Sequence, residues 1–273
     1  MEKGFEMLTV TVVQPPYFAG DNPDEKIAEF LINQLKSAER GSLIILPEYS
    51  NAGGLSDAER EKLALPRAKE MLKMAASISC ERQAYVVINV LEEREGKIKN
   101  STYLFNKSGK VAFVYDKIHL PPSEVSLGVE RGSGECLCEL DGIRFGFMTC
   151  YDVYFNEQIE FLAKKKPDII LVPGYQRGER TDIICAQAKL TAFRSNAFVL
   201  RSSYSMNDGE RGGNSMIVAP DGRILKNLGK EVGSVTAKID PKEKYVRTAG
   251  FGGGMILNDD FINNGLCPDV FEK

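Results

Sequence analysis

The sequence contains no tryptophan and a single histidine, His119, among its 273 residues. A zinc site with two or three histidine ligands is therefore excluded, and any mechanism with a histidine base has to use His119. Cys136 and Cys138 form a Cys-x-Cys pair. The pair lacks the second cysteine pair or the neighbouring histidine that a zinc site needs, so we expect no metal ion there.

Long apolar runs and large blocks of like charge are also absent. No apolar segment approaches the roughly 18 to 20 residues needed to span a bilayer, and residues 1–7 are too polar for a signal peptide. The chain has 35 basic and 38 acidic residues, and no block of like charge is longer than the three lysines at 164–166. We therefore expect a cytoplasmic protein with reduced cysteines and with neither a nucleic-acid nor a membrane partner.

The sequence does contain a regular alternation of short apolar runs and amphipathic segments. Runs typical of buried strands lie at 7–13, 43–46, 84–91, 143–148, 168–172, 198–203, 215–219 and 234–239. Helical periodicity predicts helices over 22–39, 66–81, 155–166 and 182–194, and residues 97–115 have the pattern of a hairpin. This alternation predicts an α/β fold with a mixed sheet core, helices outside and no dividing linker.

Cys150 lies between an apolar run that ends at Met148 and a helical pattern that begins near Phe155. A sharp strand-to-helix turn holds one side chain clear of both elements, and the next backbone amides point at an oxyanion formed beside it. The position suits a nucleophile. The alternative is a buried, unreactive thiol, which is the commonest state of a free cysteine.

Glu48 and Lys117 also stand at or just after the ends of apolar strands. Side chains at the carboxyl ends of strands converge on ligands in α/β sheets. Because a thiol with a pKa of about 8.5 is mostly protonated at neutral pH, a nucleophilic cysteine needs a base or a cation nearby. Glu48 is the candidate base, Lys117 the candidate cation, and Glu124 a candidate partner for Lys117. Each residue alone has a structural explanation, and their combination favours a catalytic site.

The segments around these residues resemble the signatures of the nitrilase superfamily of carbon-nitrogen hydrolases. They read LPE at 46–48, YDKIHL at 115–120 and TCYD at 149–152. Glu124 matches the family's second glutamate, and the resemblance extends over about residues 8–240. Two segments depart from the family pattern: Tyr154 replaces a frequent arginine, and the helix over 182–194 ends in TAFRSN at 191–196.

The resemblance implies a four-layer α-β-β-α sandwich in which residues 1–273 form one hydrolase domain, with a C-terminal arm from about residue 248. It implies that Glu48 is the general base and that Lys117 and the backbone amide of Tyr151 form the oxyanion hole. Cys150 would attack the substrate to form a thioester, which water then hydrolyses. The resemblance implies no metal or organic cofactor, and a homodimer or larger homo-oligomer.

The substrate stays open at this point. We expect a small amide, ureide or N-carbamoyl compound, with nitrile hydrolysis, acyl transfer to an amine and a catalytically silent scaffold as alternatives. Candidate substrate contacts are Tyr154, Tyr175, Gln176 and Arg177. His119 belongs to the lysine signature, and we expect it to be structural.

Overall fold

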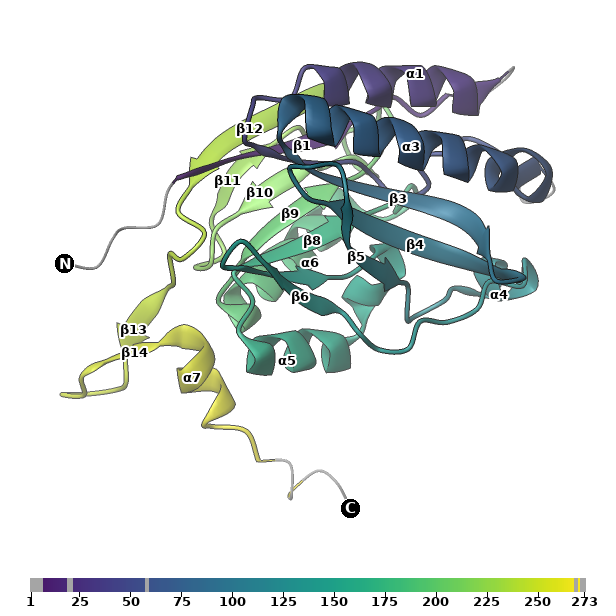
Figure 1. The fold of residues 1–273 in the computed structure, drawn as a ribbon. Helices are drawn as coiled ribbons and strands as arrows, with labels where there is room; N and C mark the ends of the chain where they lie inside the picture. Colours follow the sequence, from purple (N-terminus) through teal and green to yellow (C-terminus); the bar gives the residue numbers. More distant parts are fainter. Residues whose placement is uncertain (1–6, 19–21, 57–58, 268–269, 271–273) are drawn as a thin grey trace.

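The computed structural model describes residues 7–18, 22–56, 59–267 and 270, and its core is a pair of six-stranded sheets (Figure 1). The first sheet has the order β12 (Gly233–Ile239), β1 (Leu8–Gln14), β2 (Leu43–Ile45), β3 (Tyr85–Arg94), β4 (Lys97–Phe105) and β5 (Val111–Asp116). The second has the order β11 (Ile224–Asn227), β10 (Met216–Val218), β9 (Phe198–Ser202), β8 (Ile169–Pro173), β7 (Ile143–Phe147) and β6 (Leu137–Leu140).

Helices cover the outer faces of both sheets, which gives the expected α-β-β-α order of layers (Figure 1). On the first sheet lie α1 (Pro23–Lys36) and α3 (Leu65–Arg82), which follows a π-helical turn at Arg60–Ala64. On the second lie α5 (Asn156–Lys165) and α6 (Thr181–Ser195). The predicted fold class is confirmed. No helix in the described ranges is long and apolar enough to cross a membrane.

The two sheets share one topology, and this topology positions the polar residues singled out above. In the first sheet β1, β2 and β3 run parallel, and in the second β7, β8 and β9 do. Their carboxyl ends therefore lie along one edge of each sheet, which is where ligands bind in sheets of this kind. The antiparallel strands flank these parallel triplets.

Two apolar clusters hold the layers together. One fills the space between the sheets and the underside of α5 and α6, with buried side chains such as Val10, Val87, Phe147 and Leu171. The other packs α1 and α3 on the first sheet through residues that include Ile27 and Met71. The spacing of apolar residues along α1 buries Ile27, Leu31 and Leu35 on one face, as helical periodicity predicts.

Several short elements were not predicted. The segment 116–134, which has the composition of a loop, contains the helix α4 (Pro122–Ser126). The edge strands β6 and β11 were also missed. Asn22, the first residue of the helix predicted over 22–39, lies just before α1, has a left-handed backbone conformation and makes no capping hydrogen bond with its side chain.

The C-terminal tail folds into more structure than its glycines suggest. It forms the hairpin β13 (Val246–Thr248) and β14 (Met255–Leu257), followed by α7 (Asn258–Asn263) (Figure 1). Of these elements, α7 contacts α5 and α6. Asp259 accepts a hydrogen bond from Asn196 Nδ2 at 2.7 Å, and Asp260 pairs with Lys166 Nζ at 2.6 Å. Asp259 and Asp260 therefore join this part of the predicted arm to the ends of α6 and α5 of the same chain.

Candidate active site

Four of the predicted polar residues come together at the carboxyl ends of the parallel strands. Glu48 follows β2, and Lys117 follows β5. Glu124 lies in α4, and Cys150 is the first residue of the 3₁₀ turn η2 (Cys150–Tyr154) after β7. Both sheets thus contribute residues to this cluster.

Lys117 lies between two carboxylates in the interior. Its Nζ is 2.8 Å from Glu48 Oε1 and 2.9 Å from Glu124 Oε1. All three residues are at most 3% exposed. Burial alone would lower the pKa of Lys117, but the two carboxylates raise it above its ordinary value. The ammonium is therefore charged and held in place, as a group that stabilises an oxyanion has to be.

Two further buried residues, which the sequence did not single out, complete this cluster. Asn100 in β4 donates from Nδ2 to Glu48 Oε1 at 2.8 Å and to Glu124 Oε1 at 2.9 Å. The hydroxyl of Tyr49 donates to the same oxygen of Glu124. Burial, more than any other effect, raises the pKa of the Glu124 carboxyl, while Lys117 opposes this rise.

Cys150 sits on a strained turn beside Glu48. Its φ of 47° is in the left-handed region, which is uncommon for a residue with a side chain. A capping box between Thr149 and Asp152 fixes the turn, and Asp152 Oδ2 accepts from the Thr149 amide at 2.7 Å. The thiol is half-buried, and it forms hydrogen bonds with the Glu48 carboxylate and with the backbone of Tyr175.

The surroundings of Cys150 favour a neutral thiol in the resting site. Burial and the negative charge of Glu48 raise the pKa of the thiol well above its ordinary value, while the charge of Lys117 lowers it. Transfer of the thiol proton to Glu48 would remove the negative charge of Glu48, which raises the pKa of the thiol, and would leave the positive charge of Lys117, which lowers it. The arrangement therefore couples thiolate formation to proton transfer to Glu48.

His119 holds the nucleophile turn from outside the catalytic cluster. Its Nδ1 is 2.9 Å from Asp152 Oδ1, its Nε2 is 2.8 Å from Glu157 Oε1, and its ring stacks on Phe155 with centroids 3.9 Å apart. These contacts support the structural role expected for His119. Its pKa is raised, first by the hydrogen bond to Asp152.

The predicted substrate contacts occupy different environments. Gln176 is 7% exposed. Its Nε2 donates to Gln187 Oε1 at 2.9 Å, and its Oε1 accepts a hydrogen bond from Arg201 Nη2 at 3.0 Å. Tyr154 is 44% exposed. Arg177 is exposed, stacks over Tyr175 and donates from Nη1 to Tyr17 Oη at 2.7 Å. Tyr151, the predicted oxyanion amide, directly follows Cys150 and is half-buried.

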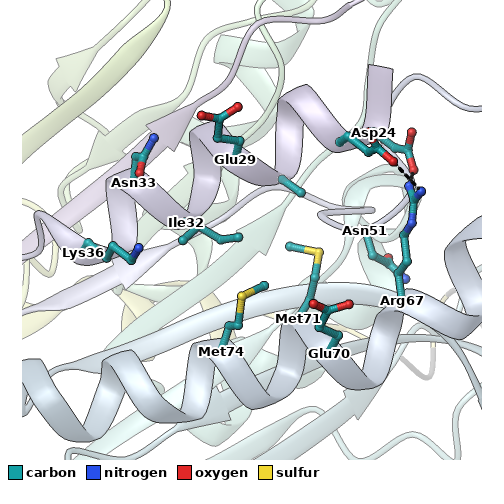
Figure 2. Close-up of a pocket in the computed structure, with 12 residues that line it drawn as sticks. Asp24, Glu29, Ile32, Asn33, Lys36, Asn51, Arg67, Glu70, Met71 and Met74 are labelled. Atoms are coloured by element: carbon teal, nitrogen blue, oxygen red, sulfur yellow. Dashed lines mark hydrogen bonds and ion pairs between the residues drawn. The ribbon is translucent and has the colours of Figure 1, made fainter. Parts of the chain in front are cut away.

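A separate groove of about 540 Å³ lies between α1 and α3 (Figure 2). Its lining includes Ile32, Met71 and Met74, with Glu29 and Glu70 at the sides. None of the four clustered catalytic candidates lines it. Within the described ranges, no three His, Cys, Asp or Glu side chains gather in a way that suits a metal ion.

Comparisons with known proteins show the family of the chain. A family model described as carbon-nitrogen hydrolase matches residues 9–245. The chain is 27% identical over 227 residues to 2-oxoglutaramate amidase of Bacillus subtilis, covering 81% of this chain and 86% of that protein. It is 23% identical over 260 residues to omega-amidase NIT3 of Saccharomyces cerevisiae, covering 87% and 88%.

The fold has counterparts among solved structures. An amidase from Nesterenkonia sp. superposes with a TM-score of 0.74 at 18% identity, over 88% of this chain and 92% of that one. In another structure of that amidase, acrylamide has added to the active-site cysteine. A further one holds butyramide.

Proposed function

This chain belongs to the carbon-nitrogen hydrolase family and is an enzyme of that class, and from this premise we propose that it hydrolyses small amides through a thioester on Cys150. The observation that carries the proposal is the buried contact of Lys117 with Glu48 and Glu124, next to a thiol bonded to Glu48. Three separate segments of the chain thereby bring a base (Glu48), a cation (Lys117) and a nucleophile (Cys150) into one site.

The first half of the reaction forms the acyl-enzyme. Cys150 Sγ gives its proton to Glu48 and attacks the amide carbon, so a carbon–sulfur bond forms and the carbonyl oxygen takes the negative charge. Lys117 Nζ and the backbone amide of Tyr151 stabilise that oxygen. Glu48 then returns the proton to the nitrogen, and the carbon–nitrogen bond breaks to release ammonia or an amine.

The second half releases the acid. Glu48, again a carboxylate, accepts a proton from a water molecule that attacks the thioester carbon, so a carbon–oxygen bond forms. The carbon–sulfur bond then breaks, and Glu48 returns the proton to Cys150 Sγ. Lys117 again stabilises the oxyanion, and its contact with Glu124 keeps the ammonium aimed at the same point. The products are a carboxylic acid and the free Cys150 thiol.

For the substrate, we propose a linear amide, ureide or N-carbamoyl compound, with amides of carboxylic acids to be assayed first. Two of the relatives above are named for 2-oxoglutaramate and for omega-amides. The exposed guanidinium of Arg177 follows Tyr175, whose backbone contacts Cys150. A positive charge there suits a substrate whose far end is a carboxylate.

The test is an ammonia-release assay over a panel of amides, carbamoyl amines and nitriles, with mass spectrometry of the trapped acyl-enzyme. Cys150→Ala should abolish release of ammonia or amine and leave the thermal melt nearly unchanged. Cys138→Ala, which removes another half-buried thiol, is the matched control and should retain activity. Turnover by Cys150→Ala would refute the assignment of the nucleophile. Adding amine acceptors to the same assay distinguishes hydrolysis from acyl transfer.

We also propose that the chain forms a homodimer or a larger homo-oligomer through the α5–α6 face. The apolar side chains of Phe161 and Leu190 are 44% and 49% exposed on these helices. Light scattering of the purified protein tests this, and Phe161→Glu with Leu190→Glu should shift the mass to that of a monomer. A monomeric wild-type protein would refute it.

A further inference from the structure

Arg201 carries a buried positive charge for which the described part of the chain supplies no carboxylate partner. It lies near the end of β9 and is only 2% exposed. Arginine is almost never fully buried unless it is paired, and the ion pairs formed within the described ranges do not include this residue. A charge in such a place requires an explanation.

The guanidinium is instead fixed by neutral oxygens. Its Nη1 donates to the backbone oxygens of Gly213 and Asn214 at 2.6 and 2.9 Å, and its Nη2 donates to Gln176 Oε1 at 3.0 Å. The rigid, planar guanidinium of arginine suits such a set of acceptors, whereas the ammonium of a lysine would not reach them all with the same geometry. Arg201 thus connects the segment before β10 with the loop that follows β8.

That loop also touches the sulfur of Cys150. The backbone of Tyr175 forms a hydrogen bond with the thiol and lowers its pKa against the larger opposing effect of burial. Gly174 lies beside the guanidinium, since a Cβ added there would be 3.4 Å from Nη2. Arg201 therefore bonds the residue after Tyr175 and lies close to the residue before it.

The charged state of Arg201 is retained at neutral pH. Burial lowers its pKa to about 10, and the titratable groups that oppose this effect are Cys150, Cys185 and Tyr154. All three are neutral in their ordinary protonated forms. The positive charge becomes compensated only when one of them, or a group bound beside them, becomes negative.

We propose that Arg201 is a positioning residue that holds the Tyr175 backbone against Cys150 through Gln176, and whose uncompensated charge stabilises the thiolate and the anionic intermediate. This inference rests on the proposed role of Cys150 as nucleophile. It assigns two separable effects to one side chain: the hydrogen bond to Gln176 keeps the loop in place, and the charge acts through space.

Three variants and one control separate the two effects. Arg201→Met removes the charge and the planar guanidinium, and Arg201→Lys keeps the charge. Gln176→Leu removes the hydrogen bond to Arg201, together with those to Gln187 and Tyr154, and leaves the charge of Arg201 in place. Arg194→Met removes a partly exposed arginine of α6 that pairs with Glu160 and serves as the control. The readouts are the rate of Cys150 alkylation by iodoacetamide from pH 6 to 9.5, followed by peptide mass spectrometry, together with kcat and KM.

In Arg201→Met, alkylation at a given pH should slow by about tenfold, which corresponds to one pKa unit, and kcat should fall more than KM rises. Arg201→Lys should restore the alkylation profile but not kcat, and Gln176→Leu should lower kcat with the profile unchanged.

An unchanged alkylation profile in folded Arg201→Met, or a profile in Arg201→Lys that matches Arg201→Met, would overturn the proposed effect of the charge. Should Arg201→Met not fold, Gln176→Leu with wild-type kcat overturns the inference by itself. The alkylation readout needs no substrate, so these failures remain distinct from turnover by Cys150→Ala, which would overturn the proposed function.

Discussion

Asn100 donates from Nδ2 to Glu48 Oε1 at 2.8 Å, the same carboxylate oxygen that Lys117 Nζ contacts at the same distance. The amide also reaches Glu124 Oε1 at 2.9 Å. Asn89 donates in turn to Asn100 Oδ1 at 2.7 Å, which fixes the orientation of the amide. Asn100 is therefore the hydrogen-bond donor that keeps two buried carboxylates side by side around one ammonium.

We predict that Asn100→Ala lowers kcat by roughly 10² because Glu48 and Glu124 lose a shared donor and Lys117 is no longer centred between them. The variant should also lose about 1 to 3 kcal/mol of stability, the usual effect of leaving buried polar groups unpaired. Steady-state kinetics and urea unfolding measure the two effects.

Asn106→Ala is the matched control for this change. Asn106 lies in the turn between β4 and β5, where its Oδ1 accepts from the backbone amides of Ser108 and Lys110 at 3.0 Å each. It should lose stability but keep kcat. Equal kcat for Asn100→Ala and Asn106→Ala, at matched fractions of folded protein, would refute the role given to Asn100.

The sequence predicted Glu48, Lys117, Glu124 and Cys150 because each stands in or near a recognisable signature at a strand end. It did not predict Asn100 or Arg201. Both are single polar residues within otherwise unremarkable strand patterns, and such residues acquire a role only when another strand or loop supplies their partners. Which oxygens Arg201 meets depends on the pairing of β9 with β8 and β10, which the sequence does not show.

The predictable part of the fold was the set of longer periodic segments. α3 and α6 were predicted close to their observed bounds because more than ten residues repeat one helical pattern, whereas the run predicted at 84–91 ends three residues before β3 does. α4, with only five residues, is too short for helical periodicity to appear. The hairpin and the helix of the tail were not predicted, because α7 is held by contacts of Asp259 and Asp260 with residues far away in the chain.

His119→Asn should retain substantial turnover, since His119 contacts Asp152 and Glu157 but none of the four clustered residues. Its effect should instead be on stability. The folded-state pKa of His119 is raised above 6.5, so its stabilisation is fully present below pH 6.5 and is lost as the pH rises through the folded-state value. The variant should melt below the wild type by several degrees at pH 6, and the gap should narrow toward pH 9.

Melting curves at several pH values, with kcat measured alongside, test this prediction. Glu157→Gln removes the second, exposed partner and should reproduce a smaller part of the same pH dependence. Complete loss of turnover in a folded His119→Asn protein would favour a cysteine–histidine mechanism, and a gap that widens with pH would contradict the assigned sign.

Arg177→Ala tests the proposed preference for substrates with a carboxylate. The guanidinium lies over the Tyr175 ring and donates a hydrogen bond to the hydroxyl of Tyr17. No carboxylate in the described residues forms an ion pair with it. KM should rise about tenfold for acidic amides such as 2-oxoglutaramate, equivalent to about 1.4 kcal/mol, and should change little for neutral amides such as butyramide. Equal changes for both classes would exclude Arg177 from carboxylate recognition.

Glu124→Gln should weaken catalysis while improving stability at higher pH. The folded-state pKa of Glu124 is raised above 4.5, chiefly by burial. For a carboxyl group this means that its contribution to stability is present below about pH 4.5 and is lost as the pH rises through the folded-state value. Glutamine, which cannot ionise, avoids this loss, so the variant should melt close to the wild type at pH 4.5 and above it at pH 8.

The same substitution should lower kcat by roughly 10², because Lys117 loses one of the two carboxylates that aim it. Glu130→Gln is the control: Glu130 is half exposed and pairs with Lys97 at 3.0 Å, so its melting difference from the wild type should stay small at every pH. A Glu124→Gln protein that melts further below the wild type as the pH rises would mean that the carboxylate stabilises the fold through Lys117 by more than its burial costs. Full activity of the variant would remove Glu124 from the catalytic cluster.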